Sequence, residues 1–213
     1  MNFRGFVASW LVASSLVLWT TTAAAQYTAA RLKSGEGPAP PPNTVGWAWD
    51  VADATVDASG RPGAWLPLWG TKGWGGVVWK AVIHSWSFDS ARDGDIKVES
   101  HVLVAACYRP ASLATGPESA APSVQTRPDV SSPTTMVPPA YPPRALGDGV
   151  VLVELAIDAS GAMKDARIVR SAGGFDSAAL DAARQWRFRP AKRAGVAVPA
   201  YAYIVFGFRQ PVT

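Results

Sequence analysis

Apolar side chains recur at every second position from Val151 to Ile157, which is the period of a strand with one buried face. Residues 158–161 are Asp, Ala, Ser and Gly, which favour a tight turn. A second extended run covers residues 164–170. The pattern therefore predicts a β-hairpin with strands at 150–157 and 164–170.

The hairpin is followed by the pattern of a helix and then of a third strand. Asp176 comes after two glycines and can cap the first free backbone amides of a helix. Pro190 disfavours helix in the residue before it, so we expect the helix to end near Phe188 or Arg189. β-branched and aromatic residues then dominate from Val196 to Phe208, as in strands. The helix would face the sheet with residues at three- and four-residue steps: Ala179, Ala182, Ala183 and Trp186.

An ordered series of residues in this ββαβ unit resembles the C-terminal domain of the TonB family over residues 138–211. The series is Tyr141-Pro142, Arg144-Ala145, Gly147, Gly149, Asp158 with Gly161, Ser171 with Gly173, Asp176 with Ala178-Ala179, Trp186, Phe188, Pro190-Ala191 and Gly195. The resemblance implies a small sheet whose last strand lends its edge to a short peptide of a TonB-dependent outer-membrane receptor. Carried over to this chain, the peptide-binding edge strand would be Ala200, Tyr201, Ala202, Tyr203, Ile204, Val205 and Phe206.

A divergent copy of the same unit is predicted at about residues 45–110. Residues 56–60 repeat the turn of residues 157–161, and Trp86-Ser87-Phe88 followed by Ala91 repeats the segment that begins at Trp186. Both segments recur in register apart from one residue, which indicates a tandem duplication. In this alignment the larger Trp79 and Ile83 replace two of the helix alanines, so we expect the first helix to lie farther from its sheet or to tilt.

These patterns predict an α+β protein of two tandem ββαβ domains, each a short antiparallel sheet with a helix on one face. The domains would be residues 45–110 and 138–213. Residues 26–44 and 111–137 are rich in Pro, Ala, Ser or Thr, and they are predicted to be extended linkers with too few apolar residues to pack.

The first 25 residues have the pattern of a secretory signal peptide. Arg4 precedes an apolar stretch from Phe6 to Trp19, and three alanines stand before Gln26. The stretch is shorter than a membrane-spanning helix, which favours cleavage and a periplasmic protein. The alternative is an uncleaved anchor in the inner membrane that couples to a proton-driven complex, as the resemblance to TonB implies.

Tryptophan and cysteine are the conspicuous residue types of the first copy. Its tryptophans either fill a small core or form an aromatic face for a glycan or a peptide on a predicted loop at residues 63–74. Cys107 has no internal partner for a disulfide. It is expected to be a small buried strand residue, with an intermolecular disulfide as the alternative.

The chain has a formal net charge of +4, and the second copy is its basic part. The basic residues either form a solvated face or steer an acidic receptor peptide or an anionic envelope polymer. A secreted chain without a nucleic-acid-binding motif argues against DNA or RNA as a partner. The candidate electrostatic contacts are Arg167, Arg170, Arg187, Arg189, Lys192 and Arg193.

No catalytic, cofactor or metal motif is present in the sequence. His101 and Cys107 would lie about 20 Å apart on one strand, too far for a nucleophile and its base. His84 falls on the first helix, where we expect it to be partly exposed. Two histidines and one cysteine do not make an ordinary zinc site. We therefore predict a protein that is not an enzyme and holds no cofactor or metal.

Two classes of function remain. The favoured one is a peptide-binding adaptor for TonB-dependent receptors, with a membrane-anchored energy transducer as its variant. The other is a structural envelope module that binds peptidoglycan or forms a homodimer through exposed sheet edges.

Overall fold

The computed structural model describes residues 27–40, 46–71, 76–110 and 127–210, and the predicted signal peptide lies outside them. We refer to the described residues up to 110 as the first half and to those from 127 as the second half. The first half contains β1 (Tyr27–Thr28), β2 (Arg31–Ser34), β3 (Ala48–Val56), β4 (Pro62–Gly70), α1 (Val77–Ser85), β5 (Ser87–Asp89), β6 (Ala91–Asp93), β7 (Ile96–Val98) and β8 (Ser100–Tyr108). The second half contains β9 (Pro133–Thr135), β10 (Gly149–Ile157), β11 (Met163–Arg170), α2 (Asp176–Ala183), β12 (Arg187–Phe188), β13 (Ala191–Arg193), β14 (Val196–Val198) and β15 (Ala200–Phe208).

The same order of elements occurs in both halves, with a long hairpin, a helix, a short ribbon and a long last strand. The predicted hairpin and helix are present in the second half, but the helix ends at Ala183, earlier than expected. The chain leaves the helix there because residues 187–188 pair with β9 instead. The predicted third strand is divided into β14 and β15, since β14 folds back on β13 as a two-stranded ribbon.

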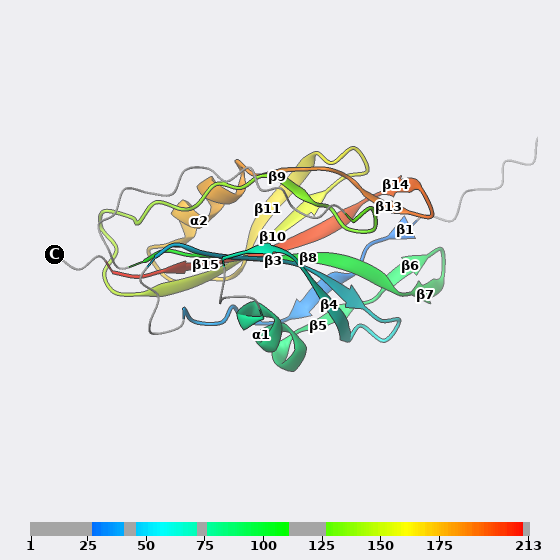
Figure 1. Cartoon of the computed structure of the whole chain (residues 1–213), viewed down its shortest axis with the longest axis horizontal. Helices are drawn as coiled ribbons and strands as arrows, with labels where there is room; N and C mark the ends of the chain where they lie inside the picture. Colours follow the sequence, from blue (N-terminus) through cyan, green and yellow to red (C-terminus); the bar gives the residue numbers. More distant parts are fainter. Residues whose placement is uncertain (1–26, 41–45, 72–75, 111–126, 211–213) are drawn as a thin grey trace, which may run out of the picture.

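The long strands of both halves form one six-stranded sheet with the order β11-β10-β15-β8-β3-β4 (Figure 1). Neighbouring strands are antiparallel except for β15 and β8, which pair in parallel at the junction of the two halves. The prediction of two separate small sheets is therefore wrong. The last long strands of the two halves, β8 and β15, join the halves through backbone hydrogen bonds, so each of these strands is paired on both of its edges.

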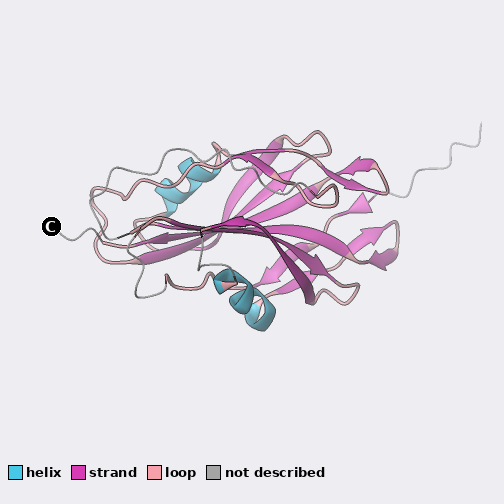
Figure 2. Ribbon diagram, in the orientation of Figure 1, coloured by secondary structure: helices cyan, strands magenta, loops and turns pink. Residues whose placement is uncertain are grey.

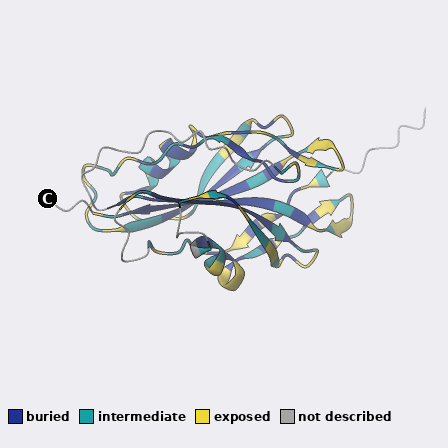
Figure 3. Cartoon of the chain, viewed as in Figure 1, coloured by how far each residue is buried: buried dark blue, intermediate teal, exposed yellow. Residues whose placement is uncertain are grey.

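The two helices cover opposite faces of this sheet (Figure 2). On the α2 face, one buried cluster contains Ala179, Ala182 and Ala183 of α2 together with Trp49 and Leu103 of the first half. On the α1 face, a second buried cluster contains Val78 and Val82 of α1 together with Tyr203 of the second half. Each core is thus built from both halves, and the central strands between them are the most buried part of the molecule (Figure 3).

Parts of both predicted linkers are ordered and packed. In the first, β2 pairs with β5, and Ala30 and Leu32 are buried in the core of the α1 face. In the second, β9 pairs with β12, and Met136 is buried in the core of the α2 face. These segments are poor in apolar residues, but pairing with a short strand satisfies their backbone, and one or two buried side chains fix each of them. Residues 111–126 lie outside the described residues.

Candidate functional site

The predicted peptide-binding strand lies in the middle of the sheet. Residues 200–208 of β15 pair with β10 on one side, and residues 202–207 pair with β8 on the other. The expectation that residues 200–206 present an open edge is therefore wrong for this structure. The first half occupies, with its own strand β8, the position beside β15 that the TonB resemblance assigns to a receptor peptide.

Displacement of β8 by a peptide would break the core of the whole molecule. Seven consecutive residues of β8, from Val102 to Tyr108, are at most 3% exposed. The opposite edge of β8 is paired with β3 along its full length. A competing peptide would have to expose all of these side chains, at about 1.5–3 kcal/mol for each large one. The β15 edge is consequently a closed structural junction.

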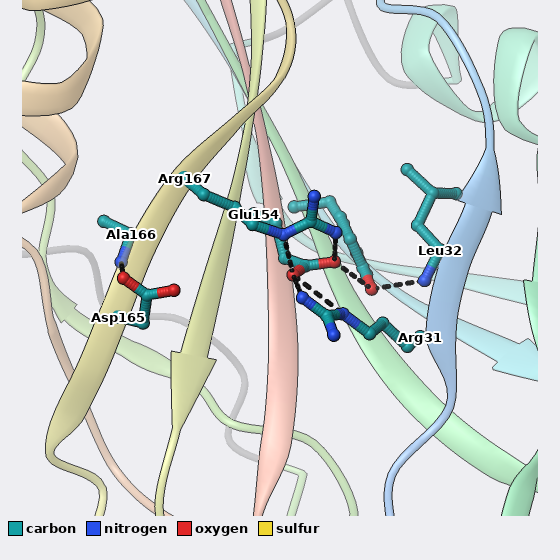
Figure 4. Close-up of polar contacts among 7 residues, drawn as sticks. Arg31, Leu32, Glu154, Asp165, Ala166 and Arg167 are labelled. Carbon is teal, nitrogen blue, oxygen red and sulfur yellow. Dashed lines mark hydrogen bonds and ion pairs between the residues drawn. The ribbon is translucent and has the colours of Figure 1, made fainter.

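A buried carboxylate ties the second half to the first on the α1 face (Figure 4). Glu154 of β10 is 2% exposed. Arg167 of the neighbouring strand β11 makes two hydrogen bonds to its carboxylate, at 2.6 and 2.9 Å. Arg31 of β2 makes two more to Oε1, at 3.1 and 2.9 Å. The Tyr203 hydroxyl donates to Oε2 at 3.3 Å and accepts from the amide of Leu32 at 2.7 Å.

The charges around Glu154 decide its protonation. Burial raises the pKa of this carboxyl, but the hydrogen bonds from Arg167 and Arg31 outweigh burial, and the pKa lies below its ordinary value. Glu154 is therefore ionised and paired at neutral pH. Because Arg31 belongs to the first half, the ion pair also fixes β2 over strands β10 and β11 of the second half.

A reciprocal cluster lies on the α2 face. Asp53 of β3 is 2% exposed. His101 Nδ1 of β8 lies 2.8 Å from Asp53 Oδ1, and Arg127 Nε of the second half lies 3.1 Å from Oδ2. The hydrogen bond to Asp53 raises the pKa of His101. Each half thus buries a carboxylate that pairs with an arginine from the segment leading into the other half.

Aromatic contacts cross between the halves on both faces. Trp49 lies 6.1 Å from Trp186 on the α2 face, measured between ring centroids. On the α1 face, Trp86 and Phe88 pack edge-on against Tyr203 at 5.7 and 5.8 Å. Together with the two ion clusters, these contacts join the halves into one packed structure.

The residues of the predicted basic cluster make different interactions and do not form one surface. Arg167 belongs to the Glu154 cluster, and Arg170 donates to the carbonyl of Gly35. Arg187 donates to carbonyls beside the end of α2, as expected for a cation at a helix C-terminus. Arg193 pairs with Asp93 of the first half at 3.7 Å. Of the six predicted contacts, Arg189 and Lys192 are the two that are exposed and line one cavity together.

The two outer strands of the sheet are the edges that no other described strand covers. β11 has four charged residues among its eight: Lys164, Asp165, Arg167 and Arg170. β4, with the sequence PGAWLPLWG, has none. Charged side chains are the usual protection of an exposed edge against pairing with another chain. Apart from its two prolines, β4 lacks such protection.

The tryptophans of the first half are divided between core and surface. Trp49 and Trp86 are buried, which confirms core filling for these two. Trp65 and Trp69 of β4 are half-buried, and Trp65 stacks on Trp79 of α1 at 5.9 Å. Trp74 lies outside the described residues. The surface that remains for a partner is therefore the strand β4 rather than a loop.

The remaining polar candidates from the sequence are Cys107 and His84, which lie on strand β8 and helix α1. Cys107 is fully buried in β8, as predicted, and burial raises the pKa of its thiol. His84 is exposed on α1. Within the described ranges, no group of three or more His, Cys, Asp or Glu side chains is placed to hold a metal ion. No helix in the same ranges has the length and apolar character needed to cross a membrane.

The comparison with known families concerns the second half. Residues 137–209 match the family model of the Gram-negative bacterial TonB protein C-terminal. This confirms the predicted TonB C-terminal domain and supports a TonB-like protein of the cell envelope. The family is one of non-enzymatic protein-interaction domains. The match does not extend to the first half, and no curated protein matches the chain.

The sequence did not reveal the Glu154 and Asp53 clusters. Glu154 interrupts an apolar strand, and Asp53 stands in the equivalent strand of the first half. These two charged positions were the signal in the sequence that could have pointed to the clusters. A charged residue at a core position calls for a partner, because a carboxylate is rarely buried alone. The partners Arg31 and Arg127 come from segments predicted to be linkers, so the pairing could not be found from local pattern.

Proposed function

We propose that this protein is a TonB-like adaptor of the cell envelope that binds an extended peptide of a TonB-dependent outer-membrane receptor by strand addition at β4. The family match supports a receptor as the partner. The observation that carries the choice of strand is the nine-residue uncharged outer strand β4, in a sheet whose β15 edge is closed by β8.

The chemistry of β4 suits an extended apolar peptide. An added strand gains backbone hydrogen bonds along the edge, and its alternate side chains select register by contact with the neighbouring strand. Leu66 and Trp69 extend the core of the α2 face, whereas Trp65 stacks on α1 at the other face. A bound peptide would therefore meet aromatic and aliphatic side chains on both of its faces.

A charge placed at an exposed position of β4 tests this proposal. Ala64 is exposed, so the variant Ala64→Lys adds a charge to the edge without filling the core, and both prolines of the strand stay in place. Binding of a labelled synthetic peptide from the N-terminal segment of a TonB-dependent receptor is measured by fluorescence anisotropy. We expect the variant to bind at least about tenfold more weakly, a loss of about 1.4 kcal/mol.

The control is Asp165→Ala on β11, which changes the net charge by the same one unit at the opposite edge. It should bind like the unmodified protein. Equal weakening in both variants would mean that net charge, not the β4 edge, governs binding, and weakening in the control alone would place the site on β11. A dimer in sedimentation that only the β4 variant dissociates, without any peptide binding, would assign the edge to a second copy of this chain.

A further inference from the structure

A second site lies on the α2 face, between the segment that leads into β9 and the chain that follows β12. The cavity has a volume of about 340 Å³, within the range of small-ligand pockets. Its charged lining residues are all cations, namely Arg127, Arg189 and Lys192, and Pro128, Val130, Ser132 and Pro190 complete the wall.

Backbone hydrogen bonds hold the two walls of the cavity together. The amide of Arg189 donates to the carbonyl of Ser132 at 2.9 Å, and the amide of Lys192 donates to the carbonyl of Pro128 at 2.7 Å. The pairing of β9 with β12 continues this contact. The two exposed cations therefore extend from a fixed backbone, so a ligand would not have to order the chain to meet them.

Two of the three cations of this cavity form no ion pair with a described carboxylate. Arg127 is held by Asp53 at 3.1 Å, and its Nη2 lies 3.9 Å from Asp129. No described carboxylate lies within ion-pair distance of Arg189 or Lys192. Arg189 and Lys192 thus stand, without an ion pair to a described carboxylate, beside a wall of two prolines and a valine.

The first half has different residues at the equivalent positions. With the offset of 100 residues between β5 and β12, the positions of Arg189 and Pro190 are held by Asp89 and Ser90. A carboxylate at that place would repel an anion. The cationic cavity is therefore a property of the second half and not a consequence of the shared fold.

We infer that this cavity binds an oxyanion, a phosphate or phosphate ester whose charge is met by Arg189 and Lys192. Arginine and lysine are common phosphate ligands in proteins, because a guanidinium forms bidentate hydrogen bonds to phosphate and an ammonium acts as a point charge. The proline and valine wall accommodates the apolar part of an ester. The site is separate from the β4 edge and does not rest on peptide binding.

The test uses the full chain in calorimetric titrations at about 0.15 M salt. The probes are inorganic phosphate, soluble glycerol 3-phosphate, and vesicles of phosphatidylcholine with and without phosphatidylglycerol. The variant Arg189→Asp/Lys192→Ala introduces the aspartate of the first half, and we expect it to weaken binding by at least about tenfold. Both side chains are exposed, so the unfolding transition should stay in place.

The control is Lys164→Asp/Arg184→Ala, which removes the same charge from exposed cations of the second half that border a different pocket. It should bind like the unmodified protein. Site-dependent binding of the soluble phosphates supports a free phosphate ester as ligand, and site-dependent binding to the phosphatidylglycerol vesicles alone supports a lipid headgroup. Equal losses in variant and control, or no binding of any probe, would overturn the inference.

Discussion

The two halves of the molecule share the turn of their first hairpin almost atom for atom, yet they differ in how they hold their helix. Asp57 Oδ1 accepts from the amides of Ser59 and Arg61 at 2.8 and 3.0 Å. Asp158 Oδ1 accepts from Ser160 and Ala162 at the same distances. Local turn chemistry is thus unchanged where the packing around it has changed.

Helix α2 rests on the sheet through small side chains, because Ala179 and Ala183 are fully buried. In α1 the equivalent buried positions are Val78 and Val82. The prediction that Trp79 and Ile83 form the packing face is wrong. Trp79 is half-buried on Trp65, and Ile83 is 41% exposed. The first half has one residue more than the second between its helix and its Trp86. Equivalent positions in the two helices are therefore found by aligning the hairpin turns, and not by aligning Trp86 with Trp186.

The starts of the two helices also differ. The Asp50 carboxylate of β3 accepts the backbone amides of Gly76 and Val78 at the start of α1. The equivalent position in β10 is Val151. Asp176 was expected to cap α2, but its carboxylate accepts from Ala172 and Ser171 in the preceding turn. A carboxylate from the sheet therefore holds the start of α1, whereas α2 begins from a turn fixed by its own first residue.

The largest expected effect comes from breaking the contact between the halves at Tyr203. Tyr203→Ala removes a fully buried ring that packs on Trp86 and Phe88, and we expect a loss of about 3–5 kcal/mol in the free energy of unfolding. Tyr203→Phe keeps the ring and should lose about 1–2 kcal/mol, because the Leu32 amide loses its acceptor. Urea denaturation measures both, and equal losses would show that the hydroxyl alone matters.

The reciprocal carboxylates come next. Glu154→Ala leaves Arg31 and Arg167 without their common partner, and we expect a loss of about 3 kcal/mol. Asp53→Ala should lose about 2 kcal/mol, because His101 can become neutral when its partner is removed. Chemical denaturation at pH 7 checks this order. A larger loss for Asp53→Ala would contradict the view that the Glu154 cluster is the stronger link.

Asp50, whose carboxylate lies at the start of α1 and has no counterpart in β10, should make the stability of the protein depend on pH. Burial raises the pKa of Asp50 to about 6, against the opposing hydrogen bonds from Gly76 and Val78. The folded state therefore binds the proton more tightly than the unfolded chain, and ionisation destabilises it as pH rises from about 4 to 6. The difference in unfolding free energy between Asp50→Asn and the unmodified protein should therefore shift by about 2–3 kcal/mol in favour of the variant between pH 4 and pH 7. A pH-independent difference would contradict the raised pKa.

The smallest expected effects test the similarity of the two hairpin turns. Gly60 and Gly161 have φ values of 85° and 86°, which disfavour any side chain. A Cβ would lie 2.0 Å from the Phe88 carbonyl oxygen at Gly60 and 2.8 Å from the Phe188 oxygen at Gly161. We expect losses of about 2 kcal/mol for Gly60→Ala and about 1 kcal/mol for Gly161→Ala in thermal unfolding. The reverse order would indicate that the second turn is the tighter one.

The sequence determined the local structure of this protein and the family of its second half. The period of residues 151–157, the Asp-Ala-Ser-Gly turn and the alanines of α2 predicted a hairpin and a helix that the structure contains. The order of motifs from Tyr141 to Gly195 identified a TonB C-terminal domain that the family match confirms. These features follow from neighbouring residues, so reading the chain in order was sufficient.

Only the tertiary structure decided what lies beside β15. Its alternating aromatic and aliphatic residues fit an edge strand and a central strand equally well, because a strand's pattern describes its faces and not its edges. The pairing with β8, the use of the supposed linkers as covering strands, and the Glu154–Arg31 and Asp53–Arg127 pairs all join residues far apart in the chain. Such contacts depend on how two similar halves meet, which no local pattern records.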